Sequence, residues 1–184
     1  LTYKNSKSIL DAFHEERISE IHFSSTTGYG YNDPGRDTIE RVFARVLKSE
    51  SALVRNQFIS GSHALNVAFF GVLRPGDTML SISGTPYDTL HEVIGIKDNP
   101  SSLKSFGIDY EQIDLKNDDF DDEKILKTLK KGNYKLVHIQ RSRGYSTRAS
   151  LDIQKLSRII SKVKSVSLNT IVMVDNCYCE LTEE

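Results

Sequence analysis

The sequence predicts an α/β fold with a mostly parallel, twisted sheet that helices cover on both faces. Strand-like runs alternate with segments in which apolar residues recur every three or four positions. The turns between these segments are short, as in parallel sheets whose crossovers are helices. The chain contains no internal repeat and no low-complexity stretch.

Length and charge limit the class of protein. The 184 residues can bury a sizeable core and suggest one domain. A net charge of −1 gives no electrostatic reason to expect nucleic acid or a membrane surface as a partner. No apolar run could span a bilayer and no secretory leader is recognisable, so we expect a cytoplasmic protein. Cys177 and Cys179 stand one residue apart, and we expect reduced thiols rather than a disulfide or a metal site.

The first third of the chain combines helical patterns with a long loop. Apolar residues recur with helical spacing over 8–20. Residues 24–36 contain three glycines, one proline and two tyrosines, and form either a functional loop or a plain surface loop. Residues 37–40 have the order of a capping box and predict a helix that runs to Lys48. Residues 53–59 have the composition of a strand.

From residue 60 onward, helices and strands alternate regularly. Apolar residues at every third or fourth position predict helices at 64–73, 89–96, 121–131 and 152–166. Of these, 121–131 begins with acidic residues and ends with lysines, as the helix dipole favours. Runs of apolar and β-branched residues predict strands at 78–83, 107–113, 135–140 and 170–174.

The turn that precedes the helix at 64–73 is a candidate site for a phosphate. The first N–H groups of a helix have no partner within it and carry a partial positive charge. Gly61 lets a ligand approach the backbone, and the hydroxyl of Ser62 can also donate a hydrogen bond. Most such turns in α/β proteins bind nothing, so an ordinary connection is the alternative.

The other candidate site residues follow the ends of predicted strands, where ligands bind in open parallel sheets. Tyr87 offers an aromatic face, and Asp175 ends the most strand-like run of the chain. A phosphate cradle, an aromatic ring and a buried carboxylate together suit pyridoxal phosphate (PLP), with its phosphate, flat ring and protonated pyridine nitrogen. Burial of Asp175 would favour a cationic partner. A turn or helix-capping aspartate is the alternative.

Five motifs, in this order, resemble the methionine gamma-lyase-like family, whose members are often called aluminium-resistance proteins. The motifs are YGYNDPGRD at 29–37, SGSHA at 60–64, GTPYDT at 84–89, QRSRGY at 140–145 and VDNCY at 174–178. The family is related to the cystathionine lyases within PLP fold type I, the aspartate-aminotransferase-like fold. The resemblance covers nearly the whole chain. It implies a PLP-dependent carbon–sulfur lyase that acts on a sulfur amino acid such as cystathionine, methionine or cysteine.

The resemblance also implies roles at the matched positions. Gly61, Ser62 and His63 would hold the phosphate of the cofactor. Tyr87 would stack on its pyridine ring, and Asp175 would pair with the ring nitrogen. Tyr87 and Asp175 would thus be the catalytic residues in this part of the family's sequence.

Two further groups of residues have implied roles outside this centre. Tyr29, Tyr31 and Arg36 resemble a loop that reaches the cofactor phosphate of a neighbouring subunit, so the active site would be shared within a homodimer or homotetramer. Arg141 and Arg143 could bind the substrate carboxylate, for which a guanidinium fork is well suited, or could simply order their loop.

The chain departs from the family in one respect. The lysine that forms the Schiff base lies after the aspartate strand in the family, whereas the last lysine here is Lys164. We therefore expect an N-terminal fragment without the C-terminal part of the fold, which would bind the cofactor weakly and catalyse nothing by itself. The expected domains are an N-terminal helix with a cofactor and dimer loop at 1–36, and a partial PLP-binding large domain at 37–184.

Two alternatives to the lyase remain open on the sequence. Another PLP fold type I enzyme, such as an aminotransferase, could use the same residues, because fold does not decide the reaction. A noncatalytic α/β module that binds a phosphorylated small molecule would also use the glycine turn.

Overall fold

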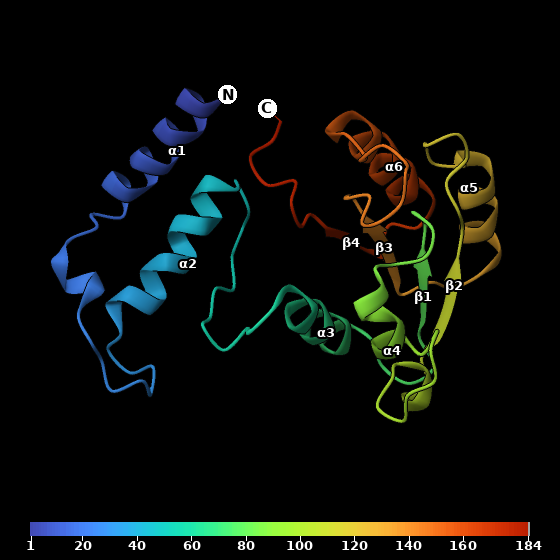
Figure 1. The fold of residues 1–184 in the computed structure, drawn as a ribbon, viewed down its shortest axis with the longest axis horizontal. Coiled ribbons are helices and arrows are strands. Elements are labelled where there is room, and N and C mark those ends of the chain that lie inside the picture. Colours follow the sequence, from blue (N-terminus) through green and yellow to red (C-terminus); the bar gives the residue numbers. More distant parts are fainter. Residues whose placement is uncertain (184) are drawn as a thin grey trace. The chain divides into compact units, whose positions relative to one another are not determined.

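The computed structural model describes residues 1–183 and divides them after Ile59 into two compact units (Figure 1). We call residues 1–59 the N-terminal unit and residues 60–183 the sheet unit. This boundary differs from the division after residue 36 that the sequence suggested. That division was drawn by function and stays a prediction.

The N-terminal unit consists of two helices and a connecting loop. Helix α1 spans Thr2–Glu15, a 3₁₀ turn spans Glu20–Phe23, and α2 spans Pro34–Val46. Arg41 of α2 donates to Glu16 at 2.7 Å, and Arg45 pairs with both Glu15 and Glu16. These charged contacts join α2 to the end of α1.

Helix α2 begins earlier than the sequence predicted. Its N-cap is Asp33, whose carboxylate accepts a hydrogen bond from the Arg36 amide at 3.0 Å, and Pro34 occupies the first turn. Proline is favoured there because its missing N–H would have no partner within the helix. The capping box predicted at 37–40 is therefore wrong, and Glu40 instead accepts from the Val54 amide and pairs with Arg55.

The strand predicted at 53–59 is also wrong. This segment is a loop with a turn at Asn56 and Gln57, and it belongs to the N-terminal unit. A strand needs a neighbouring strand for its backbone groups, whereas the Val54 amide binds the carboxylate of Glu40 at 2.9 Å. The glycine turn thus joins a loop to a helix.

The sheet unit contains four parallel strands in the order β2-β1-β3-β4. Their bounds are Thr78–Ser81 for β1, Asp109–Gln112 for β2, Leu136–Gln140 for β3 and Ile171–Asp175 for β4. Each lies within a strand predicted from the sequence or extends it by one residue. The fold class, a parallel α/β sheet, is confirmed.

Helices cover both faces of this sheet (Figure 1). Helices α5 (Asp122–Lys131) and α6 (Ile153–Val166) pack on one face over Leu80, Val137 and Ile139. Helix α3 (Gly61–Val72) and the short α4 (His91–Ile94) pack on the other face over Met79 and Leu136. The alternation of side chains along each strand supplies both cores.

The predicted helix at 89–96 is shorter and less regular than expected. A 3₁₀ turn at Asp88–Leu90 leads into α4, which ends at Gly95 with φ +95°. The left-handed conformation at Gly95 ends the helix, because it is costly for residues that carry a Cβ. A third 3₁₀ turn at Lys104–Phe106 precedes β2.

The two cysteines and the lengths of the helices can also be compared with the sequence expectations. Cys177 and Cys179 are free thiols, as expected, the first exposed and the second buried. Among residues 1–183, no helix has the length and apolar character that crossing a bilayer requires.

Candidate functional site at the carboxyl edge of the sheet

The glycine turn begins helix α3 with one amide already in use. Ser60 is the N-cap, and its hydroxyl accepts from the His63 amide at 3.1 Å. Gly61 and Ser62 occupy the first two helical positions, whose N–H groups have no acceptor within a helix. A Cβ built on Gly61 would meet no atom within 4 Å, so the space beside it is open. Gly61 and Ser62 are therefore the backbone donors left for an anion.

The hydroxyl of Ser62 joins this turn to the segment after β1. Its oxygen lies 2.7 Å from the hydroxyl oxygen of Thr89, two residues beyond Tyr87. Sequence reasoning missed Thr89 as a site residue, although it closes the motif at 84–89. The contact brings the phosphate candidate and the aromatic candidate to one edge of the sheet.

Tyr87 is held by its own backbone and by a second tyrosine. Its amide donates to Oε1 of Gln140, the last residue of β3, at 2.6 Å. Its ring lies 5.4 Å from the ring of Tyr145, centroid to centroid, with the two planes tilted by 32°. A Cβ on Gly144 would come within 3.2 Å of the Tyr87 ring, so glycine permits this close approach.

The environment keeps the Tyr87 phenol protonated. Its hydrogen bond with Tyr145, together with desolvation, raises the pKa of Tyr87 to about 12. At neutral pH the Tyr87 side chain can therefore donate a proton in a hydrogen bond but does not act as a phenolate base. Gln140 and Tyr145 were not predicted as site residues, but both lie at the carboxyl end of β3, which is where such residues are expected.

Asp175 ends β4 and is 8% exposed. It pairs in register with Gln140, so it lies at the same edge of the sheet as the Gln140 contact to Tyr87. Its carboxylate accepts from the Cys177 amide at 3.1 Å. In the part of the chain that the structure describes, no cationic side chain forms an ion pair with Asp175. Although Cys177 is exposed, partial desolvation of its thiol and the charge of Asp175 raise the pKa of that thiol, which disfavours a thiolate there.

The two candidate substrate arginines differ in their surroundings. Arg141 is 3% exposed, and its guanidinium donates to the Leu151 carbonyl at 2.8 Å and the Cys179 carbonyl at 3.0 Å. It also pairs with Glu183, 42 residues away in the chain. These contacts support the loop-ordering alternative for Arg141. Arg143 is exposed and lines a pocket.

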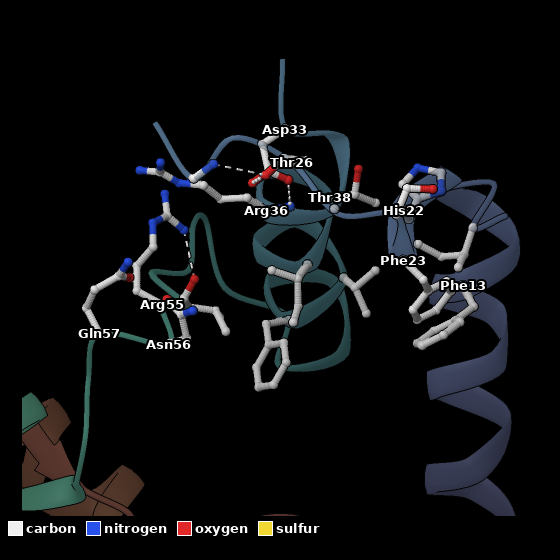
Figure 2. Close-up of a pocket in the computed structure, with 18 residues that line it drawn as sticks. Phe13, His22, Phe23, Thr26, Asp33, Arg36, Thr38, Arg55, Asn56 and Gln57 are labelled. Carbon is white, nitrogen blue, oxygen red and sulfur yellow. Dashed lines mark hydrogen bonds between the residues drawn. The ribbon is translucent and has the colours of Figure 1, made fainter. Parts of the chain in front are cut away.

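The N-terminal unit holds the other three predicted site residues as a separate group. Tyr29 and Tyr31 are each 82% exposed. Arg36 lines a pocket of about 550 Å³, in which Figure 2 shows Arg36 and Arg55 on one side and Phe13 with Phe23 on the other.

Gly30, between the two tyrosines, has φ +79°, and a side chain there would overlap the guanidinium of Arg36. The positive φ favours glycine at this position, whereas the flexible Arg36 side chain could move away from a Cβ. The described residues contain no group of three His, Cys, Asp or Glu side chains arranged to hold a metal ion.

Comparison with known proteins places these residues in a family. A Bacillus subtilis protein named YnbB, described as uncharacterized, is 44% identical over the whole chain, which spans 44% of YnbB. The structure of a carbon-sulfur lyase involved in aluminum resistance from Clostridium novyi NT is 52% identical, with a TM-score of 0.92 over 98% of this chain and 44% of that one.

More distant structures share the fold. A pyridoxal-5'-phosphate dependent protein, YhfS of Escherichia coli, matches with a TM-score of 0.69 at 16% identity over 94% of the chain and 43% of YhfS. The chain therefore spans less than half the length of these relatives. The family model for methionine gamma-lyase matches residues 1–184, and so the chain belongs to the methionine gamma-lyase family.

Proposed function

We propose that the intact protein is a PLP-dependent carbon–sulfur lyase that acts on a sulfur-containing amino acid, and that the sheet unit supplies part of its cofactor site. The observation that carries the proposal is Asp175. The residue is 8% exposed at the end of a parallel strand, and its carboxylate accepts a hydrogen bond from the Cys177 amide. A buried carboxylate is costly without a cationic or hydrogen-bonding partner, and a protonated pyridine nitrogen would supply both.

The residues at the edge of the sheet fit the rest of the cofactor. The N–H groups of Gly61 and Ser62 and the neighbouring hydroxyls suit a phosphate group. Tyr87 offers an aromatic ring within the same network of contacts, through Thr89 on one side and Gln140 on the other. The donor set therefore matches the anionic tail, the ring and the basic nitrogen of PLP.

Each residue would then have a defined task. When bound, PLP withdraws electrons from the α-carbon of an amino acid and so makes the proton on that carbon acidic. Asp175 would hold the proton on the pyridine nitrogen, Tyr87 would fix the plane of the ring, and Gly61 with Ser62 would anchor the phosphate. With its pKa raised to about 12, the Tyr87 phenol would donate a hydrogen bond at neutral pH, and another group would serve as the base.

We further propose that Tyr29, Tyr31 and Arg36 act in a neighbouring subunit of a homodimer or homotetramer. The 82% exposure of both tyrosines leaves their rings accessible to a second chain. Arg36 forms no ion pair within 4 Å among residues 1–183, although its charge helps to lower the pKa of Asp33 and of Glu40, so a phosphate of the neighbouring subunit would compete with these two carboxylates for it.

The full-length protein tests the lyase proposal directly. It is incubated with PLP and with cystathionine, cysteine or methionine in turn, and thiol and keto acid are measured. We expect both products from at least one substrate. Asp175→Asn keeps the shape of the side chain and removes its charge, so it should weaken PLP binding and lower kcat by about tenfold or more, as expected for the loss of a hydrogen bond between charged groups. Asp98→Asn removes an exposed carboxylate and serves as the matched control.

The outcomes separate the lyase from its alternatives. Transfer of the amino group without release of thiol would indicate an aminotransferase. PLP binding with no turnover of any amino acid would favour a noncatalytic binding module. Unchanged PLP affinity in Asp175→Asn would remove the basis of the proposal itself.

A further inference from the structure

A second pocket, of about 280 Å³, lies at the carboxyl edge of the sheet. Its polar lining comes from the ends of β1 and β3 and from the loop after β3, and consists of Ser83, Thr85, Gln140, Arg143, Ser146 and Arg148. Leu115 contributes apolar lining. The pocket thus contains two arginines and no acidic side chain.

Arg148 is fixed in place by backbone carbonyls. Its guanidinium donates to the carbonyls of Ala149 at 2.8 Å, Gln140 at 3.1 Å and Ser142 at 2.5 Å. Among residues 1–183 no carboxylate forms an ion pair with it. Burial lowers the pKa of Arg148, and the charge of Asp118 opposes this shift only in part. Arg141, in the same loop, differs because Glu183 balances its charge.

The other polar groups of the pocket already have partners. The Ser83 hydroxyl accepts from the Gln140 amide at 2.7 Å, and the Ser146 hydroxyl donates to the Arg143 carbonyl at 2.7 Å. Thr85 exchanges hydrogen bonds with the side chain of Gln112. The guanidinium of Arg143 has no hydrogen bond or ion pair recorded in the described part of the chain. It is therefore the donor available to a ligand.

The pocket borders the candidate cofactor site. Gln140 lines the pocket and accepts a hydrogen bond from the Tyr87 amide through Oε1, while its Nε2 donates to the Ser142 carbonyl at 3.2 Å. Gly144, next to Arg143, lies against the Tyr87 ring. A small molecule that reacts beside Tyr87 could therefore extend one end into the pocket.

We propose that this pocket binds a carboxylate of the amino-acid substrate, with Arg143 as its direct ligand and Arg148 as a fixed positive charge behind it. The inference rests on the proposed function for the identity of the ligand as a substrate. A guanidinium binds a carboxylate through two parallel N–H donors, and the absence of acidic side chains from the lining favours an anion. Substrates with a second carboxylate, as in cystathionine, would benefit if one carboxylate lies here.

The test measures binding and turnover in the full-length protein saturated with PLP, so that the phosphate cradle at Gly61 and Ser62 is already occupied. Succinate is titrated by calorimetry, with the uncharged succinamide and inorganic phosphate as comparisons. We expect succinate to bind more tightly than either. Arg143→Gln should weaken succinate binding at least about tenfold, and Arg143→Lys should retain part of it because the charge remains. Lys127→Gln removes one exposed positive charge from α5 and is the matched control.

Kinetics then connect the pocket to the substrate. Arg143→Gln should raise the KM for cystathionine by about tenfold or more. It should leave PLP affinity unchanged, because the candidate phosphate site at Gly61 and Ser62 does not line this pocket. Equal succinate affinity in the wild type and Arg143→Gln, or tighter binding of phosphate than of succinate, would overturn the proposal. If the wild type turns over no sulfur amino acid, the proposed function fails, and the succinate titration still decides whether Arg143 binds a carboxylate.

Discussion

Different interactions stabilise the interior of each of the two units. In the sheet unit, two apolar cores contain many side chains that are fully buried, such as Leu80 and Ile139 at 0% exposure. In the N-terminal unit, Ala12 and Val42 are the buried apolar residues, and most of the large apolar side chains are exposed. Caps and ion pairs, rather than a core, define the contacts within residues 1–59. Apolar residues at helical spacing therefore predict an apolar helix face, but they do not predict which element packs against it.

The largest expected effect compares a buried apolar side chain of the sheet unit with an exposed one of the N-terminal unit. Ile139→Ala should lower the free energy of unfolding of the full-length protein by about 2–5 kcal/mol, because it leaves a cavity in a closed core. Phe43→Ala, at a position that is 45% exposed, should cost much less. Urea denaturation measures both. An equal loss for the two variants would mean that the intact protein buries the apolar face of α2 and that the contrast holds only within residues 1–183.

His138 offers a pH test of the sheet unit. It is fully buried, and neither ring nitrogen has a hydrogen-bond partner among the described residues. The Phe69 ring packs on it at 5.5 Å, and Ser81 and Met173 are its register partners. Burial lowers the pKa of His138 from 6.5 to about 4.

The unfolded chain then binds a proton at a higher pH than the folded chain does. The contribution of His138 to the free energy of unfolding should be constant above about pH 6.5. As the pH drops towards 4, protonation in the unfolded chain should lower that free energy by roughly 3 kcal/mol in total. His138→Leu should flatten this part of the stability curve and leave stability at pH 7 equal or higher, since it removes unpaired buried nitrogens. Denaturation at several pH values measures the slope. If His138→Leu shows the same change in stability with pH as the wild type, other titratable groups cause that change.

The smallest expected effect concerns the polar contacts of the N-terminal unit. The Val54 amide and Arg55 lower the pKa of Glu40. Glu40→Gln keeps an acceptor but removes the charge, so the loop at 53–55 should open more often while global stability changes little. Hydrogen exchange at the Val54 amide should become several-fold faster. The wild-type contact should also weaken when acid protonates Glu40, and an unchanged exchange rate in Glu40→Gln would show that the charge does not hold the loop.

The sequence predicted the sheet better than the N-terminal unit, for a physical reason. Strands at 78–83 and 135–140 have local patterns that agree with their buried positions. Residues 53–59 have an equally strand-like composition, but within residues 1–183 no strand pairs with them. Pairing is a nonlocal property, so composition alone could not exclude the strand.

The candidate site was predicted in part. Tyr87 and Asp175 were identified because residues that follow parallel strands meet at one edge. The Glu183 partner of Arg141 could not be read from the sequence, because a contact across 42 residues leaves no local pattern. Arg143, which lines a pocket, and Arg141, which is buried and pairs with Glu183, could not be distinguished by residue type.

The position of β4 has a practical consequence for work on this chain. Within residues 1–183, β4 pairs with β3 alone, so one row of its backbone N–H and C=O groups faces no strand. Ile171, at the start of β4, is 38% exposed. A bare, partly apolar strand margin is a template for association between molecules. Residues 1–184 produced by themselves should therefore tend to associate with one another through this edge.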